Sequence, residues 1–166
     1  MIIFMYQGVG KTTLSKTSNF VDIQPEDFIQ SNGQLFSDWE YILSNQAVRL
    51  NEEGHNVLVP LNMSLYEHIK QHTDDILFVA PDSSLKDYWI NKLKTRYEED
   101  KWEPHKNAYL SALYYYDYIF DDIKDKPVKT IIIKKQNYDI LAIIESLLTL
   151  SNYKDDSFYI IDNTKR

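Results

Sequence analysis

The sequence predicts a three-layer α/β/α fold in which five parallel strands form one sheet with helices on both faces. Short apolar runs of strand length alternate along the chain with segments whose apolar residues recur at helical spacing. The runs are almost continuously apolar, which is typical of strands buried on both faces. Alternating strands and helices form parallel sheets through right-handed crossovers. The 166 residues fit one domain, 1–166.

The expected strands are short and spread along the chain. They are residues 1–6, 20–24, 56–62, 75–80 and 128–133. Pro60 lies inside the third run, and because proline cannot donate to a sheet ladder it is expected at a strand end or bulge. The segment 157–162 (SFYIID) is compatible with an additional edge strand.

Helical patterns lie between the expected strands. They cover residues 12–18, 36–51, 85–98, 106–124 and 138–150, with a break in the pattern at 99–104. A further short helix is predicted to begin at Ser64, since Glu67 three residues later completes a capping box. Gly54 is suited to end the helix before it.

The first apolar run leads into a glycine loop, QGVG, which Lys11, Thr12 and Thr13 follow at the start of a helical pattern. This order is typical of a phosphate-binding P-loop. Glycine lets backbone N–H groups surround phosphate oxygens, the lysine reaches the outer phosphates and the hydroxyl after it can ligate Mg²⁺. The residues predicted to bind the nucleotide are Gly8, Val9, Gly10, Lys11, Thr12 and Thr13. The full motif has another glycine where this chain has Met5, so a chance glycine turn remains the alternative.

Acidic residues follow the second expected strand, at the sheet edge where α/β proteins bind ligands. Asp22, Glu26 and Asp27 could each accept a substrate proton or hold a Mg²⁺-bound water. They could equally cap a turn or a helix. Asn62 ends the third strand, where many P-loop proteins have a metal-binding aspartate; it could orient a ligand or occupy a turn.

Lys92 and Arg96 are four residues apart on one expected helix, close to the break at 99–104. A guanidinium there could neutralise charge on a transferring phosphate. Alternatively, both cations could simply favour a helix C-terminus and pair with Glu98 or Glu99. Arg49, near Glu53, is expected to form a surface ion pair.

Composition restricts the function classes. The net charge of −7 argues against broad nucleic-acid binding, and no apolar run approaches the length of a membrane span. There is no cysteine for a disulfide or thiolate site, which suits a cytoplasmic protein. The four histidines have no spacing typical of a metal site. Phe36 and Trp39 fit core packing better than base stacking.

Taken together, these segments resemble small P-loop kinases of the nucleoside monophosphate kinase type, including gluconate- and shikimate-kinase-like enzymes. Their phosphate loop is similar to GVGKTTL, and their acceptor-contacting second-strand segment is similar to FVDIQPEDF. Their fourth strand and the helix leading into an arginine-bearing lid look like DILFVAPD and LKDYWINKLKTRY. Their last strand and helix, beside an adenine pocket, resemble VKTIIIKKQNYDILAIIESLL. Uncharacterised nucleotide-kinase-like proteins of bacteriophages look closest.

The resemblance implies a P-loop NTPase fold, ATP and Mg²⁺ as cofactors, an acceptor-binding region at 25–53 and a lid-like region at 92–106. It implies a cytoplasmic location, in the host if the chain is phage-encoded. The expected activity is ATP-dependent phosphoryl transfer to a small acceptor, foremost a (deoxy)nucleotide. The implied catalytic residues are Lys11, Arg96 and Asp27, the implied metal ligands are Thr12 and Asp22, and the implied acceptor-binding residues are Asp22, Asp27 and Lys92.

Two other functions remain open. Because the P-loop motif is incomplete and no acid occupies the position of Asn62, the chain could be a nucleotide-binding interaction protein with weak or no catalysis. It could also be a kinase acting on a nucleic-acid end or base, although its net charge disfavours nucleic acid as a partner. The sequence leaves the oligomeric state open, a homodimer included.

Overall fold

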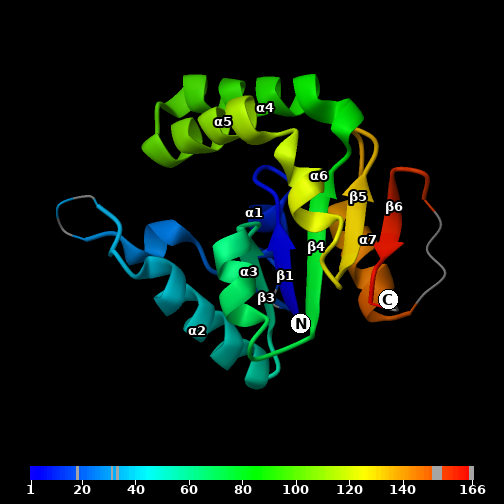
Figure 1. Cartoon of the computed structure of the whole chain (residues 1–166). Helices are drawn as coiled ribbons and strands as arrows, with labels where there is room; N and C mark the ends of the chain where they lie inside the picture. The colour runs from blue at the N-terminus through cyan, green and yellow to red at the C-terminus, as the bar shows by residue number, and fades with distance from the viewer. Residues whose placement is uncertain (18, 31, 33, 151–154, 165–166) are drawn as a thin grey trace.

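The computed structural model has one mostly parallel sheet flanked by helices, as the sequence predicts (Figure 1). It describes residues 1–17, 19–30, 32, 34–150 and 155–164. The strand order is β2-β3-β1-β4-β5-β6. The first five strands are parallel and the sixth pairs antiparallel with β5. The expected five-stranded parallel sheet and its extra edge strand are therefore confirmed.

The strands are slightly shorter than the apolar runs that predict them. Their bounds are Ile2–Met5 (β1), Phe20–Asp22 (β2), Asn56–Pro60 (β3), Ile76–Pro81 (β4), Lys129–Ile133 (β5) and Phe158–Asp162 (β6). Every residue of β1 and β4 is buried, which explains their unbroken apolar sequence. Pro60 is the last residue of β3, so it breaks no ladder within the strand.

Helices cover both faces of the sheet. In Figure 1, α3 (Met63–Ile69) and α6 (Tyr118–Ile123) lie in front of the sheet, while α1 (Lys11–Leu14) and α7 (Ile140–Leu148) lie behind it. The longer α2 (Trp39–Glu52) packs beside α3. These layers bury one continuous apolar core around β1 and β4. No helix among the described residues combines the length and apolar character needed to cross a membrane.

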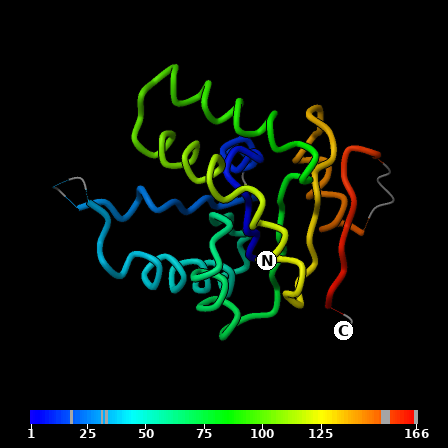
Figure 2. Tube along the Cα trace, turned by 45° about the horizontal axis from the view of Figure 1, so that its top comes forward, coloured from blue at the N-terminus to red at the C-terminus, as the bar shows by residue number. Residues whose placement is uncertain are grey.

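Two helices form a hairpin beyond the carboxyl ends of the parallel strands, at the top of Figure 1. They are α4 (Lys86–Asp100) and α5 (Glu103–Tyr115), and they pack along each other. Lys101 ends α4 in the left-handed conformation, at a φ of 56°. Figure 2 shows that this hairpin passes over the loop that follows β1. The hairpin therefore covers the edge of the sheet where ligands bind in α/β proteins.

Four helix predictions need correction. The pattern at 106–124 is two helices, because α5 begins earlier, with Pro104 in its first turn, and the chain turns at Tyr116 and Asp117. Proline is tolerated there since the first N–H groups of a helix lack partners. The helix expected at 36–51 begins at Trp39, leaving Phe36 exposed.

The third correction concerns the start of α3. Asn62, rather than Ser64, is its N-cap, and the Asn62 side chain accepts a hydrogen bond of 3.0 Å from the Leu65 N–H. The Ser64 hydroxyl instead donates to Glu40 on α2. The helix expected at 12–18 is the short α1, which ends at Leu14; Ser18, like Arg166, lies outside the described residues.

Candidate functional site

A cavity of about 1210 Å³ is lined by residues at the carboxyl ends of the strands and by the α4–α5 hairpin. Its floor is the loop after β1, residues 7–13. This loop occupies the point where the strand order reverses, since β3 lies on one side of β1 and β4 on the other. Such a switch point is the usual ligand site of open α/β sheets. The cavity therefore contains the predicted phosphate loop.

Two glycines give the loop its path. Gly8 has a φ of 81° and Gly10 a φ of 124°, a region that favours glycine. A side chain at either position would also meet the surrounding helices, because an added Cβ would lie 3.2 Å from Leu93 at Gly8 and 3.0 Å from Ile140 at Gly10. Both glycines are thus required by conformation and by close packing.

Side chains from outside the loop bind three successive loop carbonyls. The Trp89 indole N–H donates to Gln7 O, the Lys92 ammonium to Gly8 O and the Tyr138 hydroxyl to Val9 O, each at 2.9 Å. These contacts leave the three carbonyl oxygens paired within the protein. The backbone N–H groups of Gly8, Gly10, Lys11 and Thr12 have no acceptor within the part of the chain that the structure describes. Successive unpaired N–H groups of this kind form anion-binding concavities.

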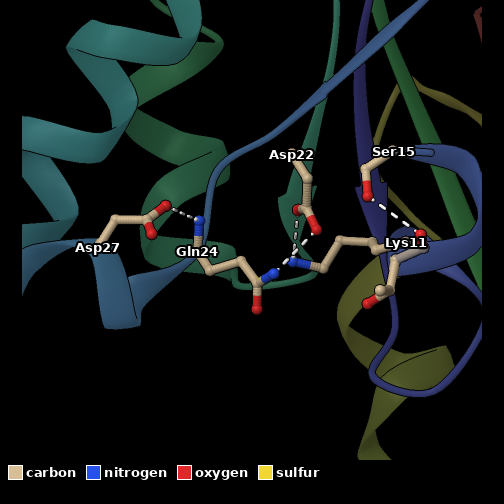
Figure 3. Close-up of polar contacts among 6 residues, drawn as sticks. Lys11, Ser15, Asp22, Gln24 and Asp27 are labelled. Atoms are coloured by element: carbon tan, nitrogen blue, oxygen red, sulfur yellow. Dashed lines mark hydrogen bonds and ion pairs between the residues drawn. The ribbon is translucent and has the colours of Figure 1, made fainter. Parts of the chain in front are cut away.

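Lys11 lies at the edge of the cavity and is bound to Asp22. The Lys11 ammonium is 3.1 Å from Asp22 Oδ1, and Gln24 Nε2 donates to Asp22 Oδ2 at 2.9 Å. Figure 3 shows Lys11 and Gln24 both reaching toward the Asp22 carboxylate. Asp22 therefore balances the charge of the loop lysine, a relationship that sequence spacing did not predict.

The acids after β2 take different positions. Asp27 is exposed and does not line the cavity; its carboxylate accepts a hydrogen bond of 2.9 Å from the Gln24 N–H and caps the short helix Pro25–Phe28. In Figure 3 it lies on the far side of Gln24 from Lys11. Glu26 lines the cavity, and its carboxylate has no hydrogen bond or ion pair to any described residue. Glu26 is thus better placed than Asp27 to contact a ligand.

Lys92 and Arg96 both line the cavity from α4, so the predicted pair does face the site. The Lys92 ammonium lies 4.7 Å from the centre of the Trp89 ring while it binds Gly8 O. Burial, with a smaller contribution from the neighbouring Arg96, lowers the pKa of Lys92. Arg96 has no ion-pair partner among the described residues. Lys92 therefore holds the loop, and Arg96 is the guanidinium available to a ligand.

Asn62 has a structural role, since it caps α3 and donates to Glu40 at 3.3 Å. Across the described ranges, no group of three or more acidic, histidine or cysteine residues is arranged to hold a metal ion. Thr12, the predicted metal-binding hydroxyl, lines the cavity and is exposed. Both oxygens of Asp22, the other predicted ligand, are engaged by Lys11 and Gln24.

Sequence reasoning missed Trp89 and Tyr138 as site residues. Trp89 falls within the helical pattern at 85–98 and Tyr138 begins the pattern at 138–150, yet each carries a polar atom that binds a loop carbonyl. The available signal was that buried tryptophan and tyrosine side chains usually pair their polar atom with an acceptor.

A comparison with models of known protein families gives no match, and neither does a comparison with curated proteins.

Proposed function

We propose that this protein has a P-loop NTPase fold and is an ATP-dependent phosphotransferase acting on a small acceptor that carries a hydroxyl or phosphate group. The observation that supports the proposal most is the loop over the cavity floor. Its carbonyls are bound by Trp89, Lys92 and Tyr138, and its N–H groups remain for an anion. Lys11, held by Asp22 in the free protein, lines the same cavity. Backbone N–H groups with an adjacent lysine are the means by which P-loops bind the phosphates of a nucleotide.

Phosphoryl transfer depends mainly on positioning and on neutralisation of charge. In the proposed reaction Lys11 leaves Asp22 and binds the outer phosphate oxygens of ATP. Arg96 approaches from α4 and neutralises charge on the transferring group. Glu26, which lines the cavity, accepts a hydrogen bond from the acceptor, the role that the sequence suggests for Asp27.

The residues present fit Mg²⁺ in the form in which kinases use it. Mg²⁺ keeps several waters and takes its remaining ligands from substrate phosphates and one or two protein oxygens. The exposed hydroxyl of Thr12, at the cavity edge, would be such an oxygen, and Asp22 could contribute through a water once Lys11 has moved. When bound, the ion would neutralise charge between the phosphates.

The test is a screen for ADP release with ATP, Mg²⁺ and a panel of nucleosides, nucleotides and small sugars. We expect turnover with at least one class of acceptor, and Lys11→Ala should abolish it. Lys16→Ala is the matched control, because Lys16 is an exposed lysine on the same segment that does not line the cavity. Acceptor-dependent turnover that survives in Lys11→Ala would reject the proposal.

The second candidate function is nucleotide binding without efficient catalysis. It is favoured by Asn62, which caps α3 at the position where many P-loop enzymes carry an acid for the metal. Tight ATP binding with no turnover across the whole panel would establish this candidate in place of the kinase. Salt-sensitive binding of an oligonucleotide would instead favour action on a nucleic-acid end.

A further inference from the structure

The two sides of the cavity differ in chemistry. The strand order places the segments after β2 and β3 on one side of the glycine loop and the segment after β5 on the other. The first of these, here called the β2 side, is lined by Glu26, Ile29, Leu35, Pro60 and Leu61. In Figures 1 and 2 the tip of the α4–α5 hairpin projects in the same direction as the segment after β2. Residues of both segments line the cavity, so a ligand on the β2 side would lie between them.

The β2 side carries almost no positive charge. The sequence between Lys16 and Arg49 contains no lysine, arginine or histidine. Arg49 does not line the cavity; it is exposed and lies 3.8 Å from Glu53. On the opposite wall the hairpin contributes Glu99 and Glu103, of which Glu103 is paired with Lys106 at 3.3 Å. An acceptor phosphate on this side would thus face carboxylates.

The cations that do line the cavity are needed elsewhere. Lys11 belongs to the glycine loop, and Lys92 already donates to Gly8 O. His105 lies 2.7 Å from Asp100, which balances its charge when it is protonated. Only Arg96 remains, and the proposed function uses it for the phosphates of ATP. A second phosphate group, on the acceptor, would lack a counter-charge.

Large apolar side chains are exposed on both the β2 side and the hairpin wall that faces it. Ile29 is 43% exposed, Leu35 39% and Trp102 48%, and all three line the cavity. An antiparallel bridge pairs Ile29 with Leu35, and Trp102 is the N-cap residue of α5, with its ring edge-on to that of His105 at 4.8 Å. Exposed apolar surface beside a cavity is typical of ligand contact. Aromatic side chains of this kind stack on nucleobases.

We propose that the acceptor is a nucleoside, an uncharged molecule with an aromatic face and a free hydroxyl, rather than a nucleoside monophosphate. The inference rests on the proposed kinase function. Trp102 and Ile29 contact the base, and Glu26 accepts the hydrogen bond of the hydroxyl. The acceptor oxygen bonds to the γ-phosphorus of ATP, the bond from that phosphorus to ADP breaks, and the hydroxyl proton passes to Glu26 and then to water.

The experiment compares each nucleoside with its own 5′-monophosphate as acceptor for the full chain with ATP and Mg²⁺, by ADP release. We expect kcat/KM to be about tenfold or more higher for the nucleoside, because the monophosphate brings unpaired charge toward carboxylates. Glu26→Gln should lower kcat for the nucleoside, because glutamine cannot take up the hydroxyl proton, and should reduce this preference. Asp38→Asn, at an exposed acid that does not line the cavity, should change neither.

Trp102→Ala tests the base contact and should weaken nucleoside binding about tenfold, as expected for a lost stacking partner. Tyr114→Ala is its control, since Tyr114 is an exposed aromatic on α5 outside the cavity. Equal or better use of monophosphates, or turnover with other acceptors only, would overturn the acceptor inference and leave the kinase function standing. If no acceptor turns over, the kinase function fails. The ligand preference is then measured by equilibrium binding of each nucleoside and its monophosphate in the presence of a non-hydrolysable ATP analogue. Preferential binding of the nucleoside supports the inference, and any other result overturns it.

Discussion

The ammonium of Lys11 lies 3.1 Å from Oδ1 of Asp22, and both side chains are largely buried, at 15% and 8% exposure. Gln24 binds the other oxygen of the same carboxylate. The loop lysine is therefore paired within the protein, and a phosphate that binds the loop must take Lys11 away from Asp22. This pairing links the strength of nucleotide binding to Asp22, the last residue of β2.

Asp22→Asn should destabilise the free protein and strengthen its response to nucleotide. Removal of one partner leaves the Lys11 charge poorly compensated, at a cost of about 1–3 kcal/mol. The phosphates of ATP restore the missing counter-charge, so the rise in melting temperature on addition of ATP and Mg²⁺ should exceed that of the wild type. Thermal unfolding with and without nucleotide measures both effects.

The control for this prediction is Asp74→Asn, which breaks an exposed ion pair with Lys70 far from the cavity. Its stability should change by less than about 1 kcal/mol, with an unaltered response to ATP. A response to ATP in Asp22→Asn that is smaller than in the wild type would mean that Asp22 assists binding of ATP and Mg²⁺ more than its pairing with Lys11 opposes it.

Gly10→Ala should disrupt the loop more than its backbone conformation alone requires. At a φ of 124° the new Cβ would lie 3.0 Å from Ile140 Cγ2. Gly54→Ala is the matched control, because Gly54 has a φ of 92° but open space around it, so it carries only the conformational cost of about 1–2 kcal/mol. We expect ATP affinity to fall at least about tenfold in Gly10→Ala, a loss of about 1.4 kcal/mol. ATP affinity in Gly54→Ala should stay unchanged; equal ATP affinity in both variants would contradict this account.

Tyr138→Phe should change the response of stability to alkaline pH. Burial raises the pKa of the Tyr138 phenol, so the folded protein keeps a proton that the unfolded chain releases above a pH of about 10. The contribution of this group to folding is therefore complete below pH 10 and is lost as the pH rises toward the folded pKa. Burial has the same effect on Tyr6 and Tyr116, which remain in the variant.

Without the hydroxyl that donates to Val9 O, the variant should lose about 1 kcal/mol at neutral pH. Its stability should then fall less steeply than that of the wild type above pH 10. Urea unfolding at a series of pH values measures both slopes. Parallel slopes would show that the Tyr138 phenol ionises alike in the folded and unfolded chain.

Arg96→Ala should lower kcat far more than ATP affinity. In the proposed reaction the guanidinium neutralises charge that develops on the transferring phosphate, a contribution of about 3–4 kcal/mol in comparable sites, or roughly two to three powers of ten in rate. Arg49→Ala, which removes an exposed arginine from an ion pair with Glu53, should leave kcat unchanged. A loss confined to ATP affinity would make Arg96 a binding residue only.

Periodicity and apolar runs predicted the sheet well because buried parallel strands leave a strong signal, as the fully buried β1 and β4 illustrate. Helical spacing predicted that Lys92 and Arg96 share one face of a helix, and the resemblance to P-loop kinases implied that this face meets the loop of Lys11; all three residues do line one cavity. It could not foresee that Trp89 and Tyr138 bind loop carbonyls, because these contacts join residues far apart in the chain. Nor could it predict that Glu26 lines the cavity while Asp27 caps the helix Pro25–Phe28, because the two acids are neighbours within a single helical turn.

Titration of ATP with Mg²⁺ into the wild type, Lys11→Ala and Lys16→Ala, followed by calorimetry, tests the central claim that the glycine loop binds phosphate. We predict saturable binding to the wild type and to Lys16→Ala, with at least about a tenfold loss of affinity in Lys11→Ala, a difference of about 1.4 kcal/mol. Equal ATP affinity in Lys11→Ala and Lys16→Ala, or no ATP binding to the wild type, would contradict it.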